Sequence, residues 1–91
     1  MFLKDPEAEL EYCVDWTDAL VADVSIVSSE WRVRPAEPGG ISIGVARVGD
    51  GVAAAHLGGG VPGHVYEVGN LVTFSDGTMD ERSMVLRLED R

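Results

Sequence analysis

Residues 75–83, SDGTMDERS, hold the densest group of side chains that could do chemistry. Four charged residues crowd around Gly77, namely Asp76, Asp80, Glu81 and Arg82. A calcium loop needs oxygen ligands at alternating positions and a bidentate glutamate further along, and this spacing is absent. Acid–base catalysis needs an enclosed pocket, which nothing in the sequence indicates. We therefore expect neither a metal site nor catalytic residues here.

The flanking residues explain the same stretch as a β-hairpin. The apolar residues on both sides of it are even-numbered, namely Tyr66, Val68, Val72, Phe74, Met84, Leu86 and Leu88. Residues that face each other in an antiparallel pair point to the same side, so the loop must contain an odd number of residues. We expect three or five residues around Asp76–Thr78, with a positive φ among them. In the three-residue version Phe74 faces Asp80 and Val72 faces Arg82, and Arg82 pairs with Asp80 or Asp15.

The other reactive residue types lack partners at a useful spacing. His56 and His64 match no metal motif, and the single cysteine, Cys13, has no second thiol for zinc and no base beside it. The glycine-rich stretch 58–63 lacks the Lys-Ser/Thr of a phosphate loop, and we expect it to be a mobile connection. No cofactor, metal ion or enzymatic activity is therefore expected.

Bulk composition narrows the functional class further. The 91 residues indicate one domain, and a net charge of −9 opposes binding to the nucleic-acid backbone. No apolar run approaches the roughly 20 residues of a membrane helix. The first ten residues are too short and too acidic for a signal peptide, and one cysteine allows no internal disulfide. We expect folding in a reducing cytoplasm, without membrane or nucleic-acid partners.

Apolar alternation predicts an all-β chain. Turn signals separate about seven short strands, a spacing typical of a β-sandwich or a small barrel. The apolar parity changes within residues 24–33, which predicts a bulge around 26–29. Further strands are expected at residues 10–17, 41–48 (with Ile41, Ile43 and Val45 on one face), 52–57, 64–74 and 84–88.

An Ig-like antiparallel sandwich is favoured because Tyr66 follows a Gly-Val-Pro-Gly corner before the penultimate strand, although it could simply be a packed aromatic. Residues 9–91 would form this domain, and residues 1–8 an N-terminal arm or a frayed terminus. Trp16 and Trp31 are expected in the core, or as an interface anchor for whichever is exposed.

Short matches spread over nearly the whole chain suggest a family. They are, in chain order, Lys4-Asp5-Pro6, Asp15-Trp16, Ser29 with Trp31, Leu57-Gly58-Gly59, Tyr66 and Asp80-Glu81-Arg82-Ser83. With these residues the chain resembles small proteins of tailed bacteriophages, of the fiber–tail adaptor or head–tail connector type, which have an Ig-like fold. The resemblance implies a virion structural protein, present in several copies and without catalysis.

Pattern and resemblance together predict a non-enzymatic adaptor at the head–tail or tail–fiber junction. Its partners would be other virion proteins (portal or adaptor, tail or fiber) in a symmetric assembly formed in the host cytoplasm. The alternatives are a capsid decoration protein, present in far more copies, and a carbohydrate- or protein-binding Ig-like module. Partner contacts are expected at Phe2, Leu3, Lys4, Trp31 and His64, and structural roles in the last hairpin at Gly77, Asp80 and Arg82.

Overall fold

The computed structural model describes residues 2–5, 7–21 and 23–89, and of Phe2 only the backbone. Within this part the chain is built from strands and a single 3-10 turn, so the all-β prediction is confirmed. No helix in this part is long and apolar enough to cross a membrane. The elements are β1 (Phe2–Lys4), β2 (Leu10–Asp15), η1 (Thr17–Ala19), β3 (Ile26–Arg34), β4 (Ile41–Gly49), β5 (Val52–Gly59), β6 (Val65–Phe74) and β7 (Met79–Leu88).

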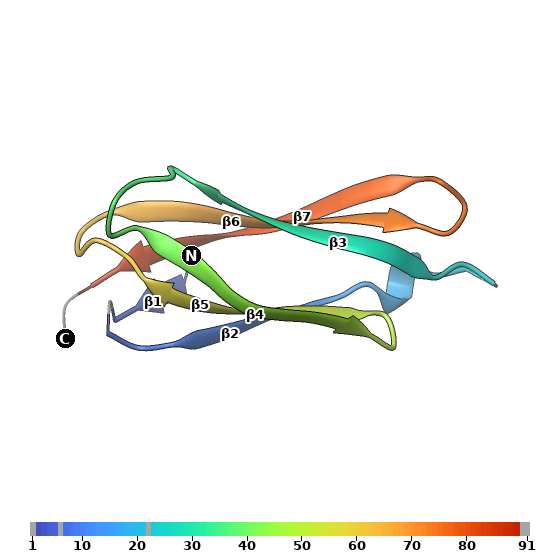
Figure 1. Cartoon of the computed structure of the whole chain (residues 1–91), viewed down its shortest axis with the longest axis horizontal. Helices are drawn as coiled ribbons and strands as arrows, with labels where there is room; N and C mark the ends of the chain where they lie inside the picture. Colours follow the sequence, from blue (N-terminus) through green and yellow to red (C-terminus); the bar gives the residue numbers. More distant parts are fainter. Residues whose placement is uncertain (1, 6, 22, 90–91) are drawn as a thin grey trace.

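Two sheets lie face to face and form an elongated sandwich (Figure 1). One sheet has the strand order β1-β7-β6-β3 and the other has the order β2-β5-β4. The pairs are antiparallel except β1 with β7, which is parallel. The sandwich prediction is therefore confirmed, and the molecule measures 45 × 21 × 19 Å along its principal axes.

The core forms because every second residue of the strands points between the sheets. One cluster surrounds Tyr66, and the other surrounds Trp16 near the hairpin between β6 and β7. The buried apolar residues are Val14, Trp16, Ile41, Ala53, Ala54, Ala55, Leu57, Tyr66, Val68, Val72, Phe74, Met84, Leu86 and Leu88. All seven even-numbered residues on which the hairpin prediction rested are in this set.

The hairpin between β6 and β7 has an odd loop, as the parity predicted. Thr73 faces Met79, and the N–H of Phe74 donates to the Thr78 carbonyl at 2.8 Å. The predicted pairing of the three-residue version is wrong, because Val72 faces Asp80 instead of Arg82. The Asp76 carboxylate accepts hydrogen bonds from the N–H and hydroxyl of Thr78 (3.0 and 2.6 Å), which centres the turn on Asp76 and moves the register by two residues.

Bulges decide which residues of the edge strands face inward. The pairing of β3 with β6 shifts between Ile26 and Ser28, which confirms the predicted bulge. β4 has a second bulge, between Ile43 and Ala46, that the sequence did not reveal. Val45 was expected beside Ile43 on the inner face, but it is 75% exposed. After this bulge the inward positions of β4 are Ala46 and Val48, which face Ala55 and Ala53.

The N-terminal segment differs from the expected arm. Phe2–Lys4 forms β1 and pairs with β7, and the N–H of Glu89 donates to the Lys4 carbonyl at 2.9 Å. These three residues therefore belong to the four-stranded sheet, so an arm covering residues 1–8 does not describe them. Met1 and Pro6 lie outside the described residues.

The glycine-rich stretch 58–63 is also held in place. Its first two residues end β5, and the N–H groups of Gly60 and Gly63 donate to the carbonyls of Gly39 and Leu88. Gly60 has a φ of 108°, and a Cβ added there would lie 2.5 Å from the Leu88 side chain. Close approach and backbone conformation both require glycine here.

Candidate interaction surfaces

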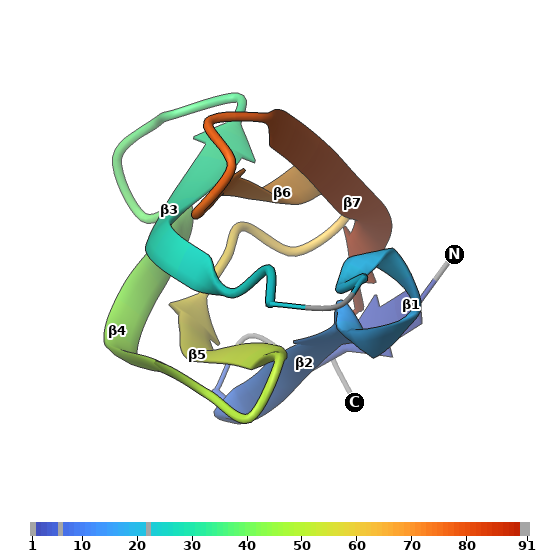
Figure 2. The same ribbon diagram turned by 90° about the vertical axis from the view of Figure 1, so that its right-hand side faces the viewer.

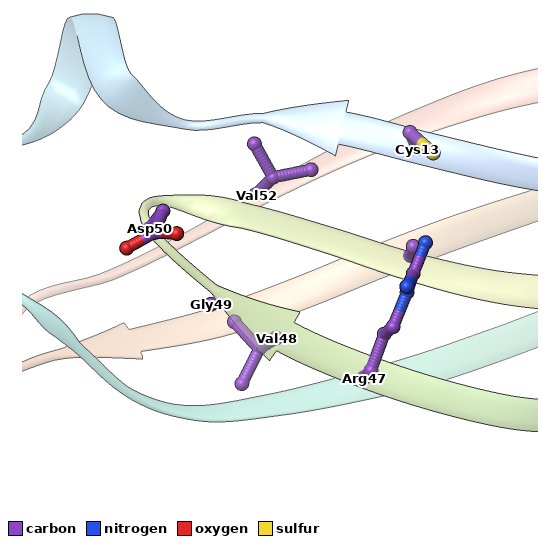
Figure 3. A pocket seen from close by; sticks show the side chains of 7 residues that line it. Cys13, Arg47, Val48, Gly49, Asp50 and Val52 are labelled. Atoms are coloured by element: carbon purple, nitrogen blue, oxygen red, sulfur yellow. The ribbon is translucent and has the colours of Figure 1, made fainter.

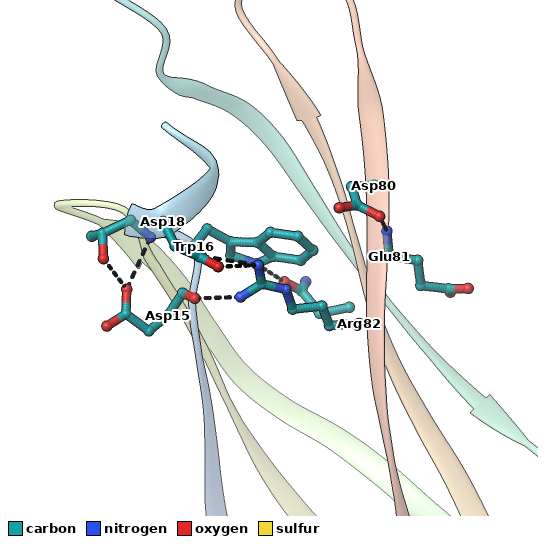
Figure 4. A network of polar contacts seen from close by, with 8 residues as sticks. Asp15, Trp16, Asp18, Asp80, Glu81 and Arg82 are labelled. Atoms are coloured by element: carbon teal, nitrogen blue, oxygen red, sulfur yellow. Dashed lines mark hydrogen bonds and ion pairs between the residues drawn. The ribbon is translucent and has the colours of Figure 1, made fainter. Parts of the chain in front are cut away.

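Arg82 joins the two sheets at the end of the molecule that carries η1 (Figure 4). Its guanidinium donates to the Asp15 carbonyl at 2.6 Å and to both carboxylate oxygens of Asp18 at 2.9 and 3.0 Å. It also lies 4.4 Å from the centre of the Trp16 ring, a cation–π contact. The predicted partner Asp80 instead accepts from the N–H of Glu81. The charges of the last hairpin therefore hold structure.

A buried polar network lies beneath this contact. The Trp16 indole N–H donates to the Asn70 side-chain oxygen at 2.9 Å, and both residues are fully buried. The Asn70 amide donates in turn to the Ser29 hydroxyl and the Glu30 carbonyl. Sequence reasoning missed Asn70, although one signal was present: it is the polar residue at an even position between Val68 and Val72.

A second network surrounds Tyr66 at the opposite end. Its buried hydroxyl accepts a hydrogen bond from the Val61 N–H at 3.0 Å and donates to the Glu37 carboxylate. His64 Nδ1 lies 2.8 Å from the same carboxylate. Hydrogen bonds from Tyr66 and then His64 lower the pKa of Glu37, whereas burial, reinforced by Glu37, raises the pKa of Tyr66. His64, a predicted partner contact, is half exposed and already held by this carboxylate.

Lys4 is only 4% exposed, which was not anticipated for a predicted partner contact. Its ammonium donates to the carbonyls of Asp5 and Gly59, both at 2.9 Å, and so ties β1 to the end of β5. Burial lowers the pKa of Lys4, while Asp5 and Glu9 act in the opposite direction. In the isolated chain this side chain stabilises the fold.

The residues predicted to contact partners do not meet on one surface. Leu3 is half exposed on β1, and Trp31 is half buried on β3, at the opposite edge of the same sheet. Trp31 packs edge-on against Tyr12, with 5.5 Å between ring centres. The side chain of Phe2 lies outside the described residues. These positions therefore remain predictions for more than one contact surface.

A shallow hollow of about 370 Å³ lies on the outer side of the three-stranded sheet, beside Cys13 and Arg47 (Figure 3). Desolvation and the neighbouring Glu11 carboxylate raise the pKa of the Cys13 thiol, which opposes formation of a nucleophilic thiolate. Arg47 lies 3.2 Å from a carboxylate oxygen of Glu11. Among the described residues no three His, Cys, Asp or Glu side chains are grouped to hold a metal.

β3 and β4 lie next to each other along one long side of the sandwich, each in a different sheet (Figure 2). Among the residues that the structure describes, β3 pairs only with β6 and β4 only with β5, so each is the edge of its sheet. Two hollows follow this side and share Val48 in their lining. The inward-pointing Val48 is 46% exposed because it lies on this edge strand.

Comparison with protein families gives one match that spans most of the chain. Residues 4–87 match the family model described as podophage GP4 fiber-tail adaptor protein gp77. No curated protein matches the sequence.

Proposed function

Since the chain belongs to the podophage GP4 fiber-tail adaptor family, we propose that it is a non-enzymatic virion protein that joins the fiber to the tail. The family match is the observation that carries this proposal. Its partners are then tail and fiber proteins of the same phage. A packed sandwich suits a joint between two larger proteins, and the polar networks around Arg82 and Tyr66 connect its elements at both ends.

The same proposal includes an Ig-like fold. Strands β2, β5 and β4 correspond to the B, E and D strands of an Ig domain, and β3, β6 and β7 to C, F and G. Tyr66 lies near the start of the sixth strand, and its hydroxyl binds the backbone five residues upstream, as in a tyrosine corner. These features support an Ig-like relationship.

Several copies per particle are part of the proposal, because copies of one chain usually assemble with closed rotational symmetry. The description of the family names a fiber–tail adaptor, which favours this junction over the capsid surface or the head–tail joint. The chain would then be assembled into the virion inside the host.

Cryo-EM of purified virions, with quantitative mass spectrometry, tests the proposal. We expect density for the sandwich between tail and fibers, and a phage lacking the gene should give tailed particles without fibers. Absence of the chain from the particle overturns the proposal. Copies spread over the capsid would instead identify a decoration protein.

A further inference from the structure

We propose that the open edge of β4 binds an extended segment of a partner virion protein that carries basic and apolar residues and pairs with β4 as an added strand. This inference rests on the proposed adaptor function. The sheet that contains β4 has three strands and faces a sheet of four. One more strand beside β4 would give the two layers the same number of strands.

The backbone of β4 presents the hydrogen-bonding groups that such a strand needs. Residues 50–51, both with positive φ (52° and 79°), form a two-residue turn between Gly49 and Val52. In a ladder closed by such a turn, Gly49 and Arg47 bond to β5. The N–H and C=O groups of Ala46 and Val48 therefore point to the open edge, in position to pair with a partner backbone.

Apolar side chains of a partner strand also have a place to lie. A hollow of about 190 Å³ between the edges is lined by Ser29 and Trp31 from β3 and by Ala46, Arg47 and Val48 from β4. A second hollow, of about 320 Å³, continues from Val48 toward Leu20, Ile26 and Asp50. Because Ser29 and Ala46 are small, the inner side of an added strand could carry side chains of the size of valine or leucine and cover Trp31.

β4 carries fewer charged side chains than β2 and β3, the other long edge strands. Soluble proteins usually place charged side chains on exposed edge strands to prevent pairing. β2 carries Glu11 and Asp15, and β3 carries Glu30, Arg32 and Arg34. The charged residue of β4 is Arg47, which is already paired with Glu11. The edge that is least protected is thus the one beside the hollows.

Charge identifies the occupant. Asp50 lines the second hollow, and Asp23 lies in the connection between Leu20 and Ser25, which line it as well. Neither aspartate forms an ion pair within the described part of the chain. A second copy of this chain would bring the same aspartates and another net charge of −9, so repulsion opposes it. A basic segment of a different protein is complementary.

Hydrogen exchange distinguishes this inference from the proposed function. Exchange of the amides of Ala46 and Val48 is compared between the free chain and intact virions. We expect hydrogen exchange in the virion to be much slower at these two amides, and to change little at the amides on the free edge of β2. If the chain is in the particle but these amides exchange as in the free chain, the edge proposal is wrong and the adaptor function stands. If the chain is absent from the particle, both fail.

A matched pair of substitutions tests the same edge in a phage complemented with variant genes. Val48→Lys places a charge between the sheets, whereas Val45→Lys places it on the outer face of the same strand. We expect Val48→Lys to reduce incorporation into particles by about tenfold or more, and Val45→Lys by less than about twofold. Val48 is half exposed, so thermal unfolding should show both variants folded. Equal incorporation of the two variants would overturn the proposal.

Charge and self-association are tested separately. Asp50→Asn keeps a residue that accepts the positive φ of the turn and removes the carboxylate. We expect roughly threefold weaker incorporation for this variant, because the attraction for a basic segment is reduced. Light scattering of the free chain should show a monomer, and a dimer abolished by Val48→Lys would instead identify a second copy as the occupant.

Discussion

Tyr66→Phe is the most informative single substitution, because it removes one hydroxyl and leaves the ring in the core. In the native protein this hydroxyl accepts from the Val61 N–H at 3.0 Å and donates to the Glu37 carboxylate. Phenylalanine has nearly the same shape, so packing around the ring should be unchanged. The loss of stability then measures the hydrogen bonds.

The expected size follows from these contacts. The bond between the Val61 N–H and the Tyr66 hydroxyl joins neutral groups, and such a bond contributes about 1 kcal/mol net. Leaving this partly buried N–H without a partner costs roughly 1–3 kcal/mol. We expect the free energy of unfolding to fall by about 2 kcal/mol. For a domain of this length that corresponds to a decrease in Tm of roughly 8–16 °C. Urea unfolding and calorimetry at pH 7 measure both quantities.

The pH dependence gives an independent signature. Hydrogen bonds from Tyr66 and His64 lower the folded pKa of Glu37 below its ordinary value of 4.5. The resulting stabilisation is present above pH 4.5 and is lost as the pH falls through the lower folded pKa. Tyr66→Phe should therefore be less sensitive to pH below 4.5 than the native chain, whereas His64→Ala should reduce this sensitivity less. An unchanged midpoint and unchanged acid sensitivity in Tyr66→Phe would refute the reasoning.

Three further predictions concern other parts of the fold. Asn70→Ala should cost about 3 kcal/mol in urea unfolding, because the buried Trp16 N–H loses its acceptor; a cost below about 1 kcal/mol would contradict the network. Gly60→Ala should destabilise by roughly 2–4 kcal/mol, because its Cβ would meet Leu88, whereas Gly63→Ala, with a φ of 83° and open space around it, should cost about 1 kcal/mol; equal midpoints would be inconsistent with this contact. Thr78 lowers the pKa of Asp76, so Asp76→Asn should remove stability that is present above pH 3.8 and lost as the pH falls further, and an identical pH profile in the variant would count against this role.

Much of the fold was accessible from sequence because alternation is a local property. Successive strand residues point to opposite faces, so the apolar parity of residues 66–74 and 84–88 located two core strands and required an odd loop between them. The parity change within residues 24–33 located the bulge in β3 for the same reason. The phage adaptor family was also recognisable from short matches along the chain, and the family model agrees.

Other features depend on contacts between residues far apart in the chain. The bulge in β4 turned Val45 outward where alternation placed it inward. The hairpin register, by contrast, was chosen from the two that parity allowed by a local contact, between Asp76 and Thr78, which the alternation of apolar residues does not contain. Lys4 was predicted to contact partners as part of an N-terminal arm, whereas pairing of β1 with β7 brings its ammonium to the Gly59 carbonyl.

The candidate interaction surfaces show most clearly the difference between what the sequence predicts and what the tertiary structure decides. The resemblance to phage proteins predicted a structural role, and residue types and their spacing along the chain predicted no catalytic site. They could not indicate that β4 is an unguarded edge beside Trp31, since an edge exists only once the strands are ordered into sheets. Strand formation follows from local periodicity, whereas strand order and edge exposure are decided by long-range pairing in the tertiary structure.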